Sequence, residues 1–134
     1  MLNILSGYET ANIKSFPIAE GVKLDQGDWV VFENGKLVKQ AGTYKAMEQG
    51  ACFPVYAGNV TFYDTRYLNE ADVVTATSGI LETDKVAAIA ITAGQALTVK
   101  DGVIDLITDN NADGNIIGFA IEDMTNGIVK LALN

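Results

Sequence analysis

The sequence predicts an all-β fold, an antiparallel sandwich or barrel-like single domain with at most short helical turns. Short apolar runs recur along the chain, and clusters of Gly, Asn and Asp separate them. No window sustains the i, i+3, i+4, i+7 apolar spacing of an amphipathic helix. With 134 residues, 49% of them hydrophobic and 19% charged, the chain has the size and composition of one globular domain.

The N-terminal stretch, residues 1–17, precedes the regular strand pattern. Phe16 is expected to be extended, because the residue before a proline avoids the helical region. We expect 1–17 to form an extended N-terminal arm that pairs with a neighbouring subunit, and a first strand of the same domain is the alternative. Residues 18–134 are expected to form the β domain.

The β domain is expected to contain ten strands and one helical turn. The strands are expected at residues 29–32, 36–39, 52–56, 60–63, 73–77, 86–91, 96–100, 103–107, 116–121 and 128–133. The helical turn is expected over residues 44–49, between Gly42 and Gly50.

Three dipeptides between apolar runs predict tight two-residue turns. They are Asn34-Gly35, Asp101-Gly102 and Asn126-Gly127. A type I′ loop needs positive φ at both central residues, which Asn, Asp and Gly tolerate. The Asp101-Gly102 loop sets three pairs opposite one another: Val99 and Ile104, Leu97 and Leu106, Thr98 and Asp105. This hairpin is therefore expected to have one apolar and one polar face.

The hairpin around Asn34-Gly35 differs, because both of its faces are apolar. Its register sets Glu33 opposite Lys36, with Val30, Phe32 and Leu37 on one face and Trp29, Val31 and Val38 on the other. One interpretation is a strand pair buried within the domain. The other is an interface within an oligomer or with a partner, since Trp is a favoured interface anchor. Trp29, Val31 and Val38 are therefore interface candidates.

A second group of interface candidates lies where the aromatic residues concentrate. Tyr63 and Tyr67 flank Arg66, with Tyr56 and Phe62 just before them. Aromatic residues and Arg are enriched at protein interfaces. Some of these rings must belong to the core, so Tyr63, Arg66 and Tyr67 are the candidates retained.

A weak internal repeat relates residues 18–67 to residues 85–134. Gly27 and the Asn34-Gly35 turn match Gly94 and the Asp101-Gly102 turn at an offset of 67 residues. Apolar positions keep this offset, and Phe53 matches Phe119 at 66. Two similar β units are one interpretation, and the general likeness of any two β-hairpins is the other.

The composition excludes several classes of function. Seventeen acidic residues against nine basic ones give a net charge of −8, which disfavours direct nucleic-acid binding. No apolar run approaches the roughly 20 residues of a membrane span, and the N-terminus does not resemble a signal peptide. The chain contains no histidine, so catalytic triads and His-ligated metal sites are excluded. Cys52 is the lone cysteine and is expected to be a buried hydrophobe.

The strongest metal candidate is the loop Asp109, Asn111 and Asp113, which is followed by Gly114. These residues occupy positions 1, 3 and 5 of a calcium loop, but Ala120 stands where a bidentate Glu is expected. A solvated turn is therefore favoured over a metal site. The carboxylate pairs Asp25/Asp28 and Glu122/Asp123 are expected to be solvated surface. No phosphate-binding glycine loop occurs, and neither an enzymatic activity nor a cofactor is expected.

Several segments together resemble the capsid decoration, or cement, proteins of tailed bacteriophages. They are residues 50–58, 64–67, 78–84, 91–103, 117–124 and 127–133. Such families pair a glycine, strand, Asp-Gly turn and strand with a later Gly-x-Ala strand and a short terminal strand. The resemblance implies a protein made in the host cytoplasm that binds the major capsid protein on the outside of an assembled shell, often as a trimer. It implies no enzymatic site.

Two alternatives to a decoration protein remain open at the level of sequence. One is another phage structural β module, such as a tail-tube or fibre component. The other is a small ligand- or calcium-binding β domain.

Overall fold

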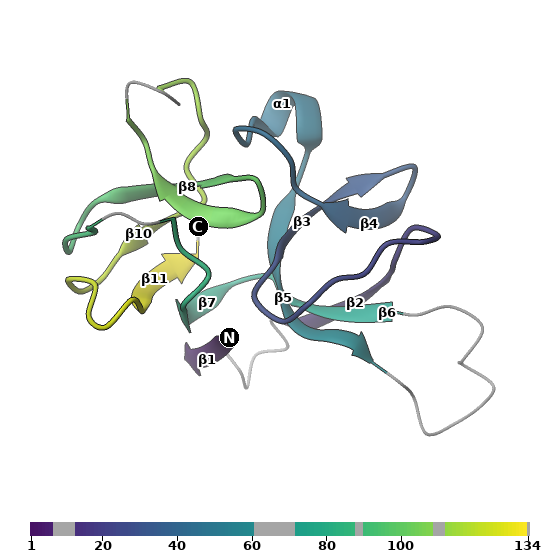
Figure 1. Cartoon of the computed structure of the whole chain (residues 1–134), viewed down its shortest axis with the longest axis horizontal. Coiled ribbons are helices and arrows are strands. Elements are labelled where there is room, and N and C mark those ends of the chain that lie inside the picture. The colour runs from purple at the N-terminus through teal and green to yellow at the C-terminus, as the bar shows by residue number, and fades with distance from the viewer. Residues whose placement is uncertain (7–12, 61–71, 88–89, 109–111, 134) are drawn as a thin grey trace.

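Two antiparallel sheets and one short helix make up the computed structural model, which describes residues 1–6, 13–60, 72–87, 90–108 and 112–133. The strands are β1 (Leu2–Ser6), β2 (Ile13–Pro17), β3 (Trp29–Glu33), β4 (Lys36–Lys39), β5 (Cys52–Val60), β6 (Asp72–Ala76), β7 (Gly79–Thr83), β8 (Ala96–Lys100), β9 (Val103–Leu106), β10 (Gly118–Ala120) and β11 (Val129–Leu133). The helix α1 spans Ala46–Gln49 (Figure 1). The all-β antiparallel fold class is confirmed.

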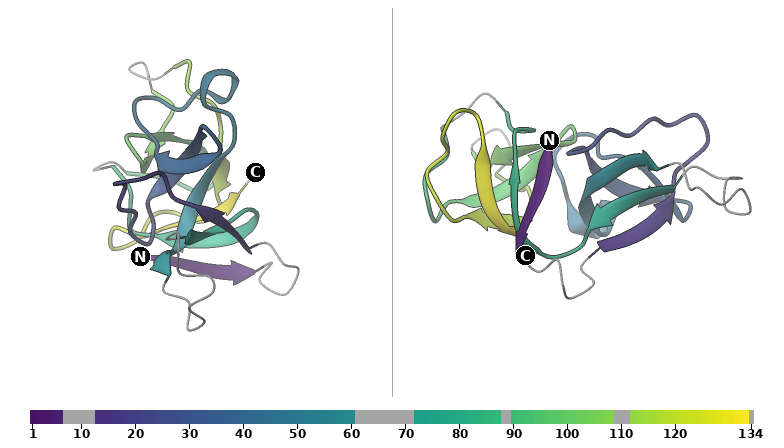
Figure 2. Two further views of the ribbon diagram at one scale, coloured as in Figure 1. Left: turned by 90° about the vertical axis from the view of Figure 1, so that its right-hand side faces the viewer. Right: turned by 90° about the horizontal axis from the view of Figure 1, so that it is seen from below.

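The two sheets repeat one topology. One sheet has the strand order β2-β6-β5-β3-β4, and the other has the order β1-β7-β11-β10-β8-β9. If β1 is left aside and the five remaining strands of each sheet are numbered in chain order, both sheets have the order first, fifth, fourth, second, third. We call residues 13–76 the first unit and residues 79–133 the second unit. The units lie side by side, and β1 adds a sixth strand to the outer edge of β7 (Figure 2).

Backbone hydrogen bonds support the same equivalence. In the first unit, Gly27 N donates to Val55 O at 2.8 Å and Val55 N donates to Asp28 O at 2.8 Å; in the second, Gly94 N donates to Ala120 O at 2.7 Å and Ala120 N donates to Gln95 O at 3.0 Å. Each unit thus ties the glycine turn before its second strand to its fourth strand in the same way.

The strand pairing corrects one match of the sequence repeat. Trp29 lies opposite Pro54, and its equivalent Ala96 lies opposite Phe119. Pro54, not Phe53, is therefore the counterpart of Phe119. The offset falls from 67 to 65 because 14 residues separate the end of β4 from Pro54, whereas 12 residues separate the end of β9 from Phe119.

An isolated parallel bridge brings the two edges of each five-stranded arrangement together. Ile18, just after β2, bridges Leu37 of β4, and Val86, after β7, bridges Ile104 of β9. Since β2 and β4 are the outer strands of their sheet, this bridge curls the sheet toward a small barrel.

Both predicted hairpin registers are confirmed. Glu33 lies opposite Lys36, and Val99 lies opposite Ile104. The turn residues Asn34 and Asp101 have φ of 52°, and the glycines that follow both have φ of 79°. These positive angles are those that a type I′ turn requires.

The apolar interior consists of two clusters. The first unit encloses Ile18, Leu24, Val30, Leu37 and Val55. The larger cluster includes the second unit's interior, with Leu81, Ile91, Leu97, Ile104 and Leu131, together with Trp29 and Val31 from the first unit. Because the larger cluster draws residues from both units, the two units pack together through it, while the smaller cluster belongs to the first unit alone.

Some predicted elements are wrong or misplaced. Of the expected strand at 86–91, the described residues have an isolated bridge at Val86, while residues 88–89 lie outside the described part of the chain. The expected strand at 116–121 shortens to Gly118–Ala120. The strand Gly79–Thr83 was not predicted, because Gly79 and Glu82 weaken its β pattern. Residue 60 ends β5, and the rest of the expected strand 60–63 lies outside the described residues.

Residues 1–17 are largely strands of the same chain. β1 pairs with β7, and β2 pairs with β6. Residues 1–17 were expected to form either an arm that pairs with another subunit or a strand of the same domain. The structure agrees with the second interpretation, because β1 and β2 pair within the chain.

Candidate docking surface

The face of the first hairpin that carries Trp29, Val31 and Val38 is covered from within the chain. Trp29 is 0% exposed and Val31 is 6% exposed, and Val38 packs against the same cluster. Trp29 N also donates to Gly102 O, at 3.1 Å, in the second unit. These three residues therefore form an interface between units of one chain, and the prediction that they meet another protein is corrected.

Gln40 connects the two units through its buried side chain. The residue is 1% exposed, its Oε1 accepts from Gly102 N at 2.9 Å, and its Nε2 donates to Gly42 O at 2.8 Å. Asp101 Oδ1 accepts from Gly42 N at 2.7 Å. The turn of the second hairpin is thus fixed against residues 40–42 of the first unit.

The remaining sequence candidates divide between described and undescribed parts of the chain. Tyr63, Arg66, Tyr67, Asp109 and Asn111 lie outside the described residues.

Asp113, the described member of the metal candidate, is exposed and pairs with Lys45 Nζ at 2.7 Å. The hydrogen bond from Lys45 lowers the pKa of Asp113, and the same bond raises the pKa of Lys45. No cluster of three potential metal-ligating side chains occurs within the described ranges. Asp113 therefore serves as a link between its loop and α1.

Both carboxylate pairs support local structure. Asp28 is only 4% exposed, which corrects the expectation of a solvated pair, and its Oδ2 accepts from Asp25 N at 3.0 Å. Glu122 pairs with Lys130 at 3.3 Å, and Asp123 accepts from Ala93 N at 2.9 Å.

Cys52 is buried, and burial raises the pKa of its thiol well above its usual range. A protonated, enclosed thiol is a poor nucleophile.

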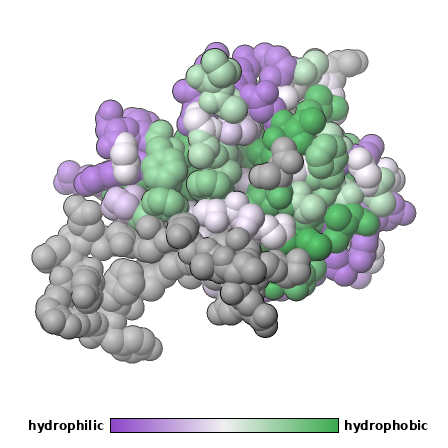
Figure 3. Space-filling view, turned by 180° about the vertical axis from the view of Figure 1, so that it is seen from behind, coloured by the Kyte–Doolittle hydropathy of each residue, from purple (hydrophilic) through white to green (hydrophobic). Residues whose placement is uncertain are grey.

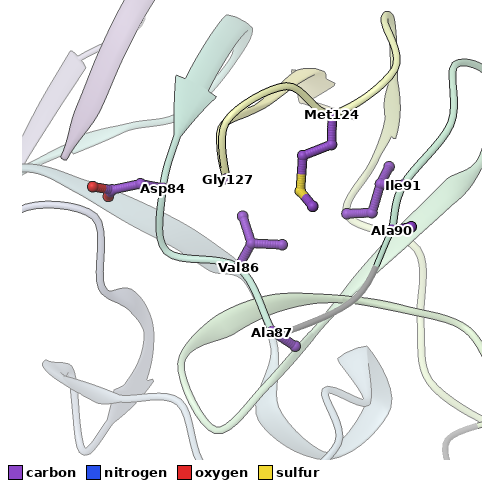
Figure 4. Close-up of a pocket in the computed structure, with 7 residues that line it drawn as sticks. All are labelled: Asp84, Val86, Ala87, Ala90, Ile91, Met124 and Gly127. Atoms are coloured by element: carbon purple, nitrogen blue, oxygen red, sulfur yellow. The ribbon is translucent and has the colours of Figure 1, made fainter.

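A hollow of about 530 Å³ lies between the segment after β7 and the loop before β11. Val86, Ile91 and Met124 form its wall, and Met124 points toward the other two (Figure 4). The Asp84 carboxylate points away from it (Figure 4) and pairs with the N-terminal amine at 2.9 Å. A ligand pocket needs convergent polar groups to orient its occupant, and the described lining of this hollow supplies none.

Outward-facing apolar side chains form a row across neighbouring strands of the second unit. Phe119 of β10 lies opposite Ala96 of β8 on one side and Ala132 of β11 on the other. Ala132 in turn lies opposite Ile80 of β7. Directly opposed side chains on one sheet face have Cβ atoms about 4.5–5.5 Å apart, so the row is continuous. We call Ile80, Ala96, Phe119 and Ala132 the apolar stripe.

The stripe is open to solvent at its centre and continues at its margins. Phe119 is 43% exposed, and Ile121, two residues further on the same outward side, is 41% exposed. Leu5, 47% exposed, lies in β1 just before the partner of Ile80. Hydrophobic side chains gather over the half of the molecule that holds the second unit (Figure 3).

A charged row runs beside the stripe on the same face. Asn3 lies opposite Glu82, and Glu82 lies opposite Lys130. Asn3 donates to the Glu82 carboxylate at 2.9 Å, and Ile121 N donates to Lys130 O at 3.0 Å. A shallow hollow of about 320 Å³ adjoins this row, lined by Glu82, Glu122, Asp123, Thr125, Asn126, Ile128 and Lys130. Three carboxylates therefore face one ammonium there.

Sequence reasoning missed the stripe as a surface. The alternation of Phe119 and Ile121 was visible, but Phe119 was interpreted only as a repeat position. The neighbours Ile80, Ala96 and Ala132 are joined to Phe119 only by strand register, which links residues distant in the chain.

No helix in the described parts of the chain is long and apolar enough to cross a membrane. A scan against protein-family models and a search of curated proteins found no match to the chain.

Proposed function

We propose that the chain is a structural virion protein that binds the outer surface of an assembled phage capsid and stabilises it. The observation that carries this proposal is the apolar stripe, with Phe119 43% exposed at its centre. A contiguous apolar patch on a protein surface marks a site of contact with another protein. The resemblance to capsid decoration proteins supplies the partner, the major capsid protein.

Repetition on the shell strengthens such a contact. An icosahedral shell offers many identical sites, and linked copies bind far more tightly than one copy alone. The proposal therefore includes a homotrimer, which would place three equivalent stripes against three neighbouring shell subunits. It includes no catalytic step, no cofactor, no membrane contact and no direct contact with nucleic acid.

The test is to mix the purified protein with expanded shells that lack it. The expected result is saturable co-sedimentation and a higher temperature of shell disassembly. Shells whose sites are already occupied are the control and should bind no more. Failure to bind any shell form contradicts the proposal.

The same preparation separates the alternatives. A tail-tube or fibre component would polymerise or join tail structures in electron micrographs. A calcium-binding domain would melt at a higher temperature with added calcium, since a ligand specific for the folded state stabilises it.

A further inference from the structure

We infer that the second unit docks through the apolar stripe onto a partner surface that is apolar at its centre and basic around it. This inference rests on the proposed function and specifies which face of the chain meets the shell and what chemistry the shell must present there.

The distribution of charge between the two units indicates the sign of the charge that the partner surface should carry. The second unit, residues 79–133, has eight acidic residues against three basic ones, a net charge of −5. The first unit, residues 13–76, has eight against six, a net charge of −2. The unit that exposes the stripe is therefore the more acidic one, and complementary potentials guide docking.

The charged side chains beside the stripe are also negative on balance, with three carboxylates and one ammonium. Lys130 is the lysine of the charged row, and its ammonium is already paired with Glu122 at 3.3 Å. Glu82 and Asp123 complete the acidic lining of the shallow hollow. Carboxylates at the rim of an apolar contact accept Arg and Lys side chains of a partner, which fixes the register of docking.

Electrostatics also argues against a second copy of the chain as the occupant. Pairing two stripes face to face would place two units of net charge −5 against each other. Juxtaposed like charges are penalised at interfaces. The stripe therefore fits a basic partner better than itself, and any trimer contact should use another face.

Phe119 is the expected anchor of the contact. It is the largest side chain of the stripe, it sits at the centre of the row, and it is flanked on both sides by alanines. Small neighbours leave an aromatic ring raised above the sheet, where it can enter a pocket. A few central aromatic residues commonly contribute most of the binding energy of an interface.

The experiment compares matched variants in the shell-binding assay. Phe119→Ser and Ile121→Ser should each weaken binding at least about tenfold, while Met47→Ser should bind like the parent. Met47 is the control because it is 98% exposed and lies in α1 of the first unit. Thermal melts of each variant show whether folding is intact, as expected for such exposed side chains.

A second pair of variants tests the charge. Glu122→Lys should slow association severalfold, whereas Glu20→Lys, an equal charge change on an exposed residue of the first unit, should have little effect. Parent binding should weaken as salt rises.

The outcomes separate this inference from the proposed function. If the parent binds shells and all variants bind equally, the docking face is wrong and the function stands. If the parent binds no shell, the function is wrong, and NMR titration with a peptide of alternating Lys and Leu tests the face alone. Chemical-shift changes confined to the stripe and the charged row would support this docking face. Chemical-shift changes elsewhere would contradict it. So would dimerisation of the protein that the variant Phe119→Ser abolishes.

Discussion

Gly118 occupies a position in β10 that leaves no space for a side chain. A Cβ there would overlap the carbonyl oxygen of Ala132 in the neighbouring strand β11. Backbone atoms of a central strand cannot move aside without breaking the ladder. The residue therefore fixes how closely β10 and β11 approach, and with it the placement of Phe119 next along the chain.

Gly118→Ala is expected to lower the free energy of unfolding by about 1–3 kcal/mol, the usual cost of overpacking. Urea unfolding followed by circular dichroism measures it. Ala41→Ser is the control, since it also adds one heavy atom but at an exposed residue, and it should change little. Equal stabilities for the two variants would show that the strands can separate at no cost.

The pair Lys45–Asp113 predicts a local pH dependence. The lowered pKa of Asp113 means that its contact with Lys45 is present above the ordinary carboxyl pKa, near 4, and is lost as the pH falls through the lowered value. In Lys45→Met, the pKa of Asp113 should rise toward the ordinary value. NMR titration of the side-chain carboxyl carbons measures the pKa of Asp113 in the parent and in the variant. An unchanged pKa of Asp113 would contradict the pairing.

Among the elements, the two hairpins show how far sequence reasoning reaches. Their turns and registers were predictable, because Asn-Gly and Asp-Gly determine the turn type and alternation determines the face. Burial of Trp29 within the domain was one of its two interpretations, but the sequence could not identify the second unit as its cover, since that depends on how two units pack. The stripe escaped prediction for the same reason: its residues come from four strands that only the sheet order brings together.

The equivalent turn glycines provide a matched pair for mutation. Gly35 and Gly102 share a φ of 79°, but a Cβ at Gly35 meets nothing within 4 Å, while at Gly102 it meets Lys39 Cε at 2.5 Å. Gly35→Ala should cost about 1–2 kcal/mol for the left-handed conformation alone. Gly102→Ala should cost about 1 kcal/mol more, because the side chain of Lys39 must move as well. Chemical denaturation of both variants measures the difference, and a larger loss at Gly35 would contradict the docking of the second turn.

At the scale of the whole molecule, the shared core predicts that the two units unfold together. Trp29 belongs to the first unit but packs within the cluster of the second, so neither can open alone without exposing it. Trp29 fluorescence and far-UV circular dichroism should give coincident transitions. The variant Gln40→Leu should lower the midpoint for both probes, because it leaves the buried Gly102 N without its acceptor. Two separate transitions in the parent protein would contradict the shared core.

The unlike outer faces of the equivalent hairpins have a consequence for how the repeat can grow. Val31 and Val38 of the first hairpin are apolar and pack against the second unit, whereas their counterparts Thr98 and Asp105 are polar, and Thr98 donates to Asn115 O at 2.7 Å. A third unit could not attach to the second in the way that the second attaches to the first, because Thr98 and Asp105 stand where the first hairpin has Val31 and Val38.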